Sequence, residues 1–121
     1  MTISVEVGSD AVAIRFTGPD QLWTLSKGIL LPYADILSVG VESRSVLQKD
    51  LGWRVGGGYF PGRMATGHFL SKTRRGARQL WAVYRDTELL VIETRRDRPH
   101  RVVLQTPDRE NLARIISSRL Q

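Results

Sequence analysis

Short runs of alternating apolar and polar residues recur along this chain, and they constrain its fold more than any other feature. The first run, residues 3–7, places isoleucine or valine at every second position. A period of two is typical of a β-strand with one buried face. A second run of the same kind, residues 12–16, follows the turn-forming residues 8–10. The first sixteen residues are therefore predicted to form a β-hairpin.

Similar runs predict a mostly β protein. Further strands are expected over residues 28–31, 37–41, 53–60, 67–71, 79–84, 89–92 and 102–104. The run 79–84 is apolar on both faces, which indicates a central strand. Residues 67–105 are interpreted as an up-and-down meander, and the polar stretch 43–51 is predicted to be a loop. The glycines at 56–58 inside a strand indicate a bulge or a close backbone approach.

The end of the chain changes its pattern from strand to helix. Thr106 is a suitable N-cap, and Pro107 suits the first helical position because its missing N–H would be unpaired there anyway. Apolar residues then follow three-and-four spacing, at Leu112, Ile115, Ile116 and Leu120. This single amphipathic helix is predicted to pack on the sheet or to close an open end of it.

Length and composition favour one globular domain over residues 1–121. Cysteine is absent, which excludes disulfides and thiolate metal sites and is compatible with a reducing cytoplasm. No apolar run reaches the ~18 residues needed to cross a bilayer, and the N-terminus alternates rather than forming a signal peptide. We therefore expect a cytoplasmic protein without a transmembrane segment, and a peripheral position on the inner face of the membrane stays open.

Three segments resemble elements of bacterial pleckstrin-homology-like domains. They are ILLPYADILSV at 29–39, GGYFPG at 57–62 followed by GHF at 67–69, and LQTPD at 104–108 followed by Leu112. Together they span roughly residues 11–120. The resemblance implies a strongly bent antiparallel sheet or partly open barrel, closed by a C-terminal helix. It implies a binding or assembly module and carries no ligand-binding residue to this chain.

Catalytic chemistry finds little support in the residues. His68 and His100 are the only imidazoles, and neither has the spacing to a carboxylate of a known metal site. Gly57 and Gly62 have the glycine spacing of a phosphate-binding loop, but Arg63-Met64 follows in place of Lys and Ser or Thr. We expect a non-enzymatic protein without a metal or cofactor.

The positive charge is concentrated in two predicted turns, residues 72–78 and 95–101. They hold eight Lys or Arg and one Asp, a net charge of +7, whereas the rest of the chain has a net charge of −1. Successive turns of a meander alternate between the ends of a sheet, so these two turns are predicted at the same end. The candidate binding residues are Lys72, Arg74, Arg75, Arg78, Arg95, Arg96 and Arg98. The alternative is that these turns are charged only because they are solvated.

Three functional hypotheses follow from these features. The first is an interaction module that binds an anionic lipid surface or an acidic protein surface through the basic turns, self-associates through its glycine-rich strands, or does both. The second is nucleic-acid binding through the loops 72–78 and 95–101, which is less favoured because no recognition helix or ladder of stacked aromatics is visible. An enzyme is the least favoured.

Overall fold

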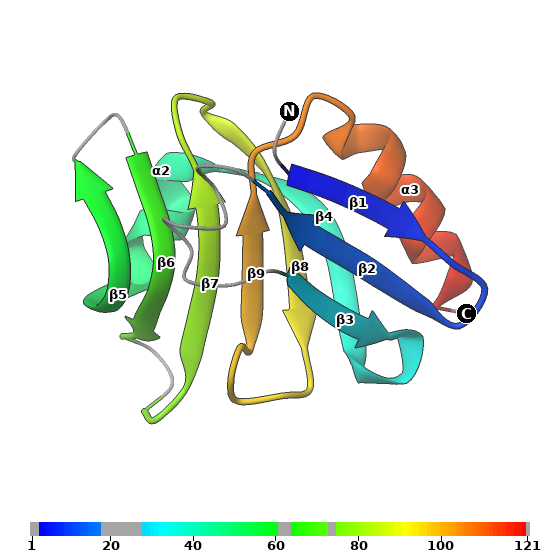
Figure 1. Cartoon of the computed structure of the whole chain (residues 1–121), viewed down its shortest axis with the longest axis horizontal. Coiled ribbons are helices and arrows are strands. Elements are labelled where there is room, and N and C mark those ends of the chain that lie inside the picture. The colour runs from blue at the N-terminus through cyan, green and yellow to red at the C-terminus, as the bar shows by residue number, and fades with distance from the viewer. Residues whose placement is uncertain (1–2, 18–27, 61–63, 73–74, 121) are drawn as a thin grey trace.

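The chain folds into two β-sheets and one C-terminal helix (Figure 1). The computed structural model describes residues 3–17, 28–60, 64–72 and 75–120, with 53–60 described by their backbone. The first sheet has the order β1-β2-β3 and consists of β1 (Ile3–Val7), β2 (Ala11–Phe16) and β3 (Gly28–Pro32). Its antiparallel β1–β2 hairpin confirms the hairpin predicted from the alternation of residues 3–16.

The second sheet has six strands in the order β4-β8-β9-β7-β6-β5. They are β4 (Ile36–Ser43), β5 (Leu51–Phe60), β6 (Met64–Ser71), β7 (Arg78–Val83), β8 (Glu88–Thr94) and β9 (Arg101–Leu104). Neither sheet closes into a barrel, and the mainly β fold with one C-terminal helix is the class predicted from the sequence.

The meander predicted over residues 67–105 is wrong in one respect. Strand β9 inserts between β8 and β7 and pairs in parallel with β7, with Gln79 opposite Arg101. Because β9 is antiparallel to β8, successive strands still run in opposite directions. The β6–β7 and β8–β9 turns therefore lie at the same end of the sheet, as the meander had predicted (Figure 1).

The stretch 43–51, predicted to be a loop, contains two short helical segments. These are α2 (Arg44–Leu47) and the 3-10 turn η2 (Gln48–Asp50), and another 3-10 turn, η1 (Tyr33–Asp35), joins β3 to β4. One apolar residue of this polar stretch packs in the core, since Leu47 is buried in the same cluster as Trp81. The prediction was wrong because a single buried leucine is too weak a signal of periodicity.

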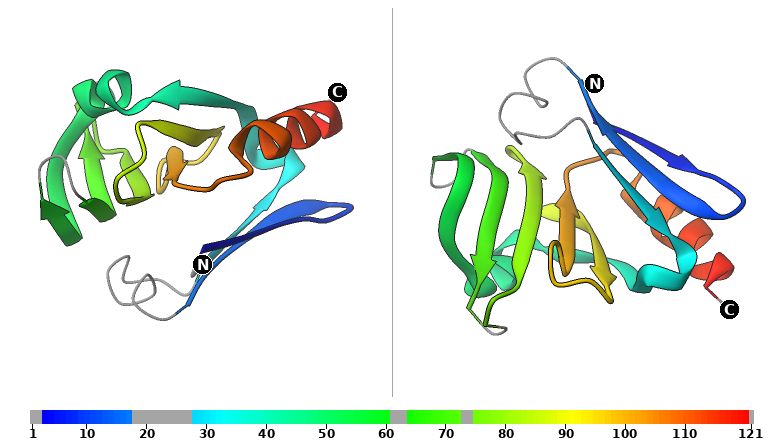
Figure 2. Two further views of the ribbon diagram at one scale, coloured as in Figure 1. Left: turned by 90° about the horizontal axis from the view of Figure 1, so that it is seen from above. Right: turned by 60° about the horizontal axis from the view of Figure 1, so that its bottom comes forward.

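Helix α3 (Arg109–Arg119) begins later than the predicted cap at Thr106. Its N-cap is Asp108, which makes no side-chain capping bond, whereas Thr106 is buried before the helix starts. The buried side chains of α3 are Leu112 and Ile116. The helix packs chiefly against β4, as two further views show (Figure 2).

The six-stranded sheet buries apolar side chains on both faces. On the first face, Ile92 and Leu104 pack with Ile14 of the small sheet and Ile116 of α3. On the second face Trp81 is fully buried and makes an edge-to-face contact with Phe69 at a ring-centroid distance of 6.2 Å. This second face also carries a polar network, described below.

Candidate functional site

Two backbone hydrogen bonds hold the basic turns against each other. The N–H of Arg78 donates to the carbonyl of Asp97 over 2.8 Å, and the N–H of His100 donates to the carbonyl of Arg78, also over 2.8 Å. The first residue of β7 is thus fixed to the β8–β9 turn from both sides. The structure therefore brings two segments together that are about twenty residues apart in the sequence.

Four cations of these turns are exposed. They are Lys72, Arg75, Arg95 and Arg98, and none of them forms an ion pair within the described residues. Arg78 is only partly exposed. The remaining candidate of the first turn, Arg74, lies outside the residues that the structure describes.

Arg95, although exposed, and Arg96, which is partly buried, are hydrogen-bonded to η1 and its neighbours. The backbone N–H of Arg95 donates to the carbonyl of Asp35 over 2.7 Å, and its Nε donates to the carbonyl of Ala34 over 3.0 Å. Arg96 forms an ion pair with the Asp35 carboxylate at 2.9 Å and donates to the carbonyl of Leu30. The charge of Arg96 is therefore balanced by a carboxylate. Within the described residues, the side chain of Arg95 is bonded to a backbone carbonyl instead.

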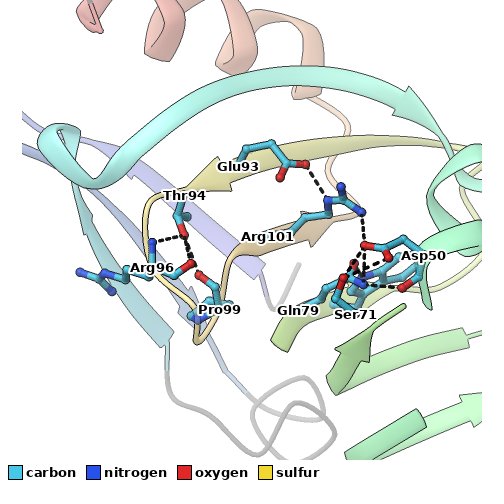
Figure 3. Close-up of polar contacts among 9 residues, drawn as sticks. Asp50, Ser71, Gln79, Glu93, Thr94, Arg96, Pro99 and Arg101 are labelled. Atoms are coloured by element: carbon cyan, nitrogen blue, oxygen red, sulfur yellow. Dashed lines mark hydrogen bonds and ion pairs between the residues drawn. The ribbon is translucent and has the colours of Figure 1, made fainter. Parts of the chain in front are cut away.

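Arg101, the last cation of the second turn, belongs to a buried network on the second face of the sheet (Figure 3). Its Nε donates to Glu93 over 2.6 Å and its Nη1 to Asp50 over 3.2 Å, and the side chain is 18% exposed. Asp50 also accepts from the hydroxyl of Ser71 at 2.9 Å and from the amide of Gln79 at 3.3 Å. One carboxylate thus joins three strands to η2.

The network also reaches the core and the first basic turn. The side-chain amide of Gln79 donates to the backbone carbonyl of Asp50, and its carbonyl accepts from the Trp81 indole over 3.0 Å. The N–H of Lys72 donates to the same Asp50 carbonyl over 3.1 Å. The network therefore sets where the first basic turn leaves the sheet. In the sequence, the signal of this network was Gln79, the polar residue that begins the otherwise apolar run 79–84.

An open groove of about 480 Å³ lies beside this network, between β4 and the α2–η2 segment. Val46 and Val91 contribute apolar lining, Glu93 and Arg101 line its polar side, and a side chain at Gly40 would meet nothing within 4 Å. Glu93 and Arg101 are already bonded to each other, and the other charged residues that line the groove are Glu42, Lys49 and Asp50. Among the described residues no group of three His, Cys, Asp or Glu side chains could hold a metal ion.

The two histidines do not assemble a catalytic pair in what the structure describes. Burial, and secondarily the positive charge of Arg78, lower the pKa of His68 from its ordinary value. The charged neighbour of His68 is thus a cation, whereas a general base is usually assisted by a carboxylate. His100 is buried, with its backbone N–H and carbonyl bonded to Arg78 and Thr94.

Comparison with known proteins adds no family to this description. No family model, no curated protein and no solved structure matches the chain. The resemblance to bacterial pleckstrin-homology-like domains therefore stays a prediction from the sequence. Among the described helices, none combines the length and the hydrophobicity that crossing a bilayer requires.

Proposed function

We propose that the domain is a non-enzymatic interaction module that binds an anionic lipid surface through its basic end. The basic end is the set of cations at this end of the sheet whose charge is not balanced by an ion pair within the described residues: Lys72, Arg75, Arg78, Arg95 and Arg98. The observation that supports the proposal is the pair of backbone hydrogen bonds that fixes the two basic turns side by side. Like charges held together repel, and an anionic partner relieves that repulsion.

Two exposed leucines favour a lipid surface over an acidic protein. Leu30 is 60% exposed and Leu37 is 50% exposed, and they flank the η1 turn to which Arg95 and Arg96 are bonded. Peripheral membrane proteins commonly combine cations that attract anionic headgroups with a few apolar side chains that enter the interface. Each cation near an anionic leaflet contributes about 1 kcal/mol, so five predict weak, salt-sensitive attachment.

The test is co-sedimentation with vesicles of phosphatidylcholine, with and without phosphatidylserine, at low and physiological salt. We expect binding only to the anionic vesicles. The double variant Arg75→Glu with Arg98→Glu should weaken it by at least about thirtyfold, since each cation contributes about 1 kcal/mol and each is replaced by an anion. A matched control, Arg85→Glu with Arg114→Glu, makes the same change in net charge at exposed residues outside the basic end.

The outcomes separate the alternatives. Wild-type protein that ignores anionic vesicles at low salt would contradict the lipid proposal. An equal loss in the control variant would show that net charge, rather than the basic end, drives attachment. Binding to duplex DNA without vesicle binding, with a log–log salt slope of about −0.9 per neutralised phosphate, would replace the lipid with a nucleic acid.

A further inference from the structure

The two edges of the six-stranded sheet differ in what lies beside them. Along β4 the helix α3 packs, and the hydroxyl of Ser117 donates to the carbonyl of Val39 over 3.2 Å. Strand β5, ten residues long, forms the opposite edge and pairs only with β6 (Figure 1). Within the described ranges, no other strand pairs with β5. One edge is therefore covered by the protein itself and the other is open to a partner strand.

The second half of the open edge lacks the usual features that prevent pairing. Natural edge strands are commonly short, or carry lysine, proline or a bulge. The register of β5 shifts twice before Gly56, and from Gly56 to Phe60 it pairs regularly with β6. This regular part, with Val55, contains no charged residue and no proline. It therefore presents outward backbone N–H and C=O groups, and it contains no charged residue or proline that would block pairing with a second strand.

We infer that β5 pairs antiparallel with β5 of a second copy of this chain, giving a dimer with twofold symmetry. Two molecules of net charge +6 repel each other, and this uncharged segment is a surface through which they can approach with little repulsion. When a strand pairs antiparallel with its own copy, both copies contribute the same residues and form the same hydrogen bonds, as a twofold interface requires. A second copy therefore fits this edge better than a charged foreign strand does.

One register makes the segment self-complementary. If Gly57 of one copy lies opposite Gly57 of the other, then Gly56 lies opposite Gly58 and Val55 lies opposite Tyr59. Cross-strand pairs of a β-branched with an aromatic residue stabilise sheets. The twofold axis then passes between the two copies of Gly57.

This inference does not rest on the proposed lipid binding. Antiparallel pairing through β5 reverses the direction of every strand in the second copy, so the two basic ends point in opposite directions. Each basic end stays accessible, and a monomer could still bind vesicles. The two properties also respond oppositely to salt, because screening weakens attachment to anionic lipid and reduces repulsion between two cationic copies.

The first test measures mass by light scattering with purified protein at increasing concentration. We expect a dimer that persists or strengthens as salt rises. Gly57→Lys alone and Gly57→Glu alone should each give monomer, because like charges meet across the axis, and an equimolar mixture should restore the dimer. Circular dichroism checks that both variants fold. A monomeric wild type at high micromolar concentration would overturn the inference, as would a mixture of folded variants that stays monomeric.

The second test does not depend on charged variants. The chain has no cysteine, so single cysteines placed in turn at residues 55–60 report which residues meet their own copies. Disulfide cross-linking should peak at Gly57→Cys and decline on both sides. The control is Ser4→Cys, at an exposed position on β1, an edge strand of the small sheet. Cross-linking at Ser4→Cys without any in β5 would move the interface to the other sheet and overturn the inference.

Discussion

Arg96 and Arg98 lie two residues apart in the same turn, yet their side chains have different surroundings. Arg96 is tied to Asp35 and to the carbonyl of Leu30, whereas Arg98 is exposed and forms no ion pair within the described residues. Arg101, three residues further on, is held even more firmly, between Glu93 and Asp50. A cluster of arginines in a sequence can thus contain two groups, one that forms ion pairs within the domain and one that faces solvent.

The ion pairs of Arg96 with Asp35 and of Arg101 with Asp50 differ in their expected contribution to stability. The Arg96–Asp35 pair is about one-third exposed on each side, and ion pairs at a surface contribute about 0–1 kcal/mol. The Arg101–Asp50 pair is mostly buried, and removing one partner of a buried pair typically costs about 3–5 kcal/mol. The arginines that form ion pairs within the domain, here called tied, are therefore expected to affect folding, and the exposed cations without an ion pair among the described residues, here called outward, are the ones proposed to bind a partner. Three variants test this division.

The largest effect is expected from Asp50→Ala. This change leaves the buried guanidinium of Arg101 and the amide of Gln79 without a shared acceptor, so unfolding free energy should fall by about 3 kcal/mol. Urea denaturation measures the loss. Glu88→Ala is the control, because Glu88 is exposed and such a change typically stays within about 0.5 kcal/mol. If Asp50→Ala falls within the range of the control, the network does not stabilise the fold.

A smaller and more diagnostic effect is expected from comparing Arg96→Ala with Arg98→Ala. Loss of the Asp35 pair should lower unfolding free energy by about 0.5–1 kcal/mol, whereas Arg98→Ala should leave stability unchanged. In vesicle co-sedimentation the order should reverse, with Arg98→Ala weakening attachment about fivefold, the equivalent of about 1 kcal/mol. Both variants having the same pattern in the two assays would contradict the division into tied and outward cations.

Strand positions were predictable from the sequence, because each strand carries its own alternation. The order of the strands was not, since periodicity says which residues form strands but not which strands are neighbours. An antiparallel meander and the observed insertion of β9 both reverse direction at each successive strand. The position of the basic turns was therefore predicted correctly from a partly wrong topology.

The sequence could not separate the tied arginines from the outward ones. The carboxylates that hold them come from far along the chain, with Asp35 61 residues from Arg96 and Asp50 51 residues from Arg101. Asp50 itself lies in η2, within the stretch that was predicted to be a loop. A charge total over two turns counts every arginine equally, and only tertiary contacts show which of these charges are balanced.

The smallest expected effect concerns Arg78, which lies between the two groups because it is half-buried beside His68. Burial first, and the Arg78 charge second, lower the pKa of His68 below its usual value of about 6.5. In NMR titrations, Arg78→Gln should therefore raise the pKa of His68 only part of the way, because the effect of burial remains. A pKa that does not move in Arg78→Gln would show that the charge of Arg78 is not felt at His68.

The same depressed pKa makes stability depend on pH in a definite direction. Between the lowered folded pKa and the unfolded value, the unfolded chain binds more protons at His68, so unfolding free energy rises with pH. The contribution is fully present above about pH 6.5 and is lost as the pH falls through that value toward the folded pKa. Denaturation series at pH 5 and pH 7.5 should show a smaller difference in His68→Gln than in the wild type. An equal difference in both proteins would place the pH dependence on groups other than His68.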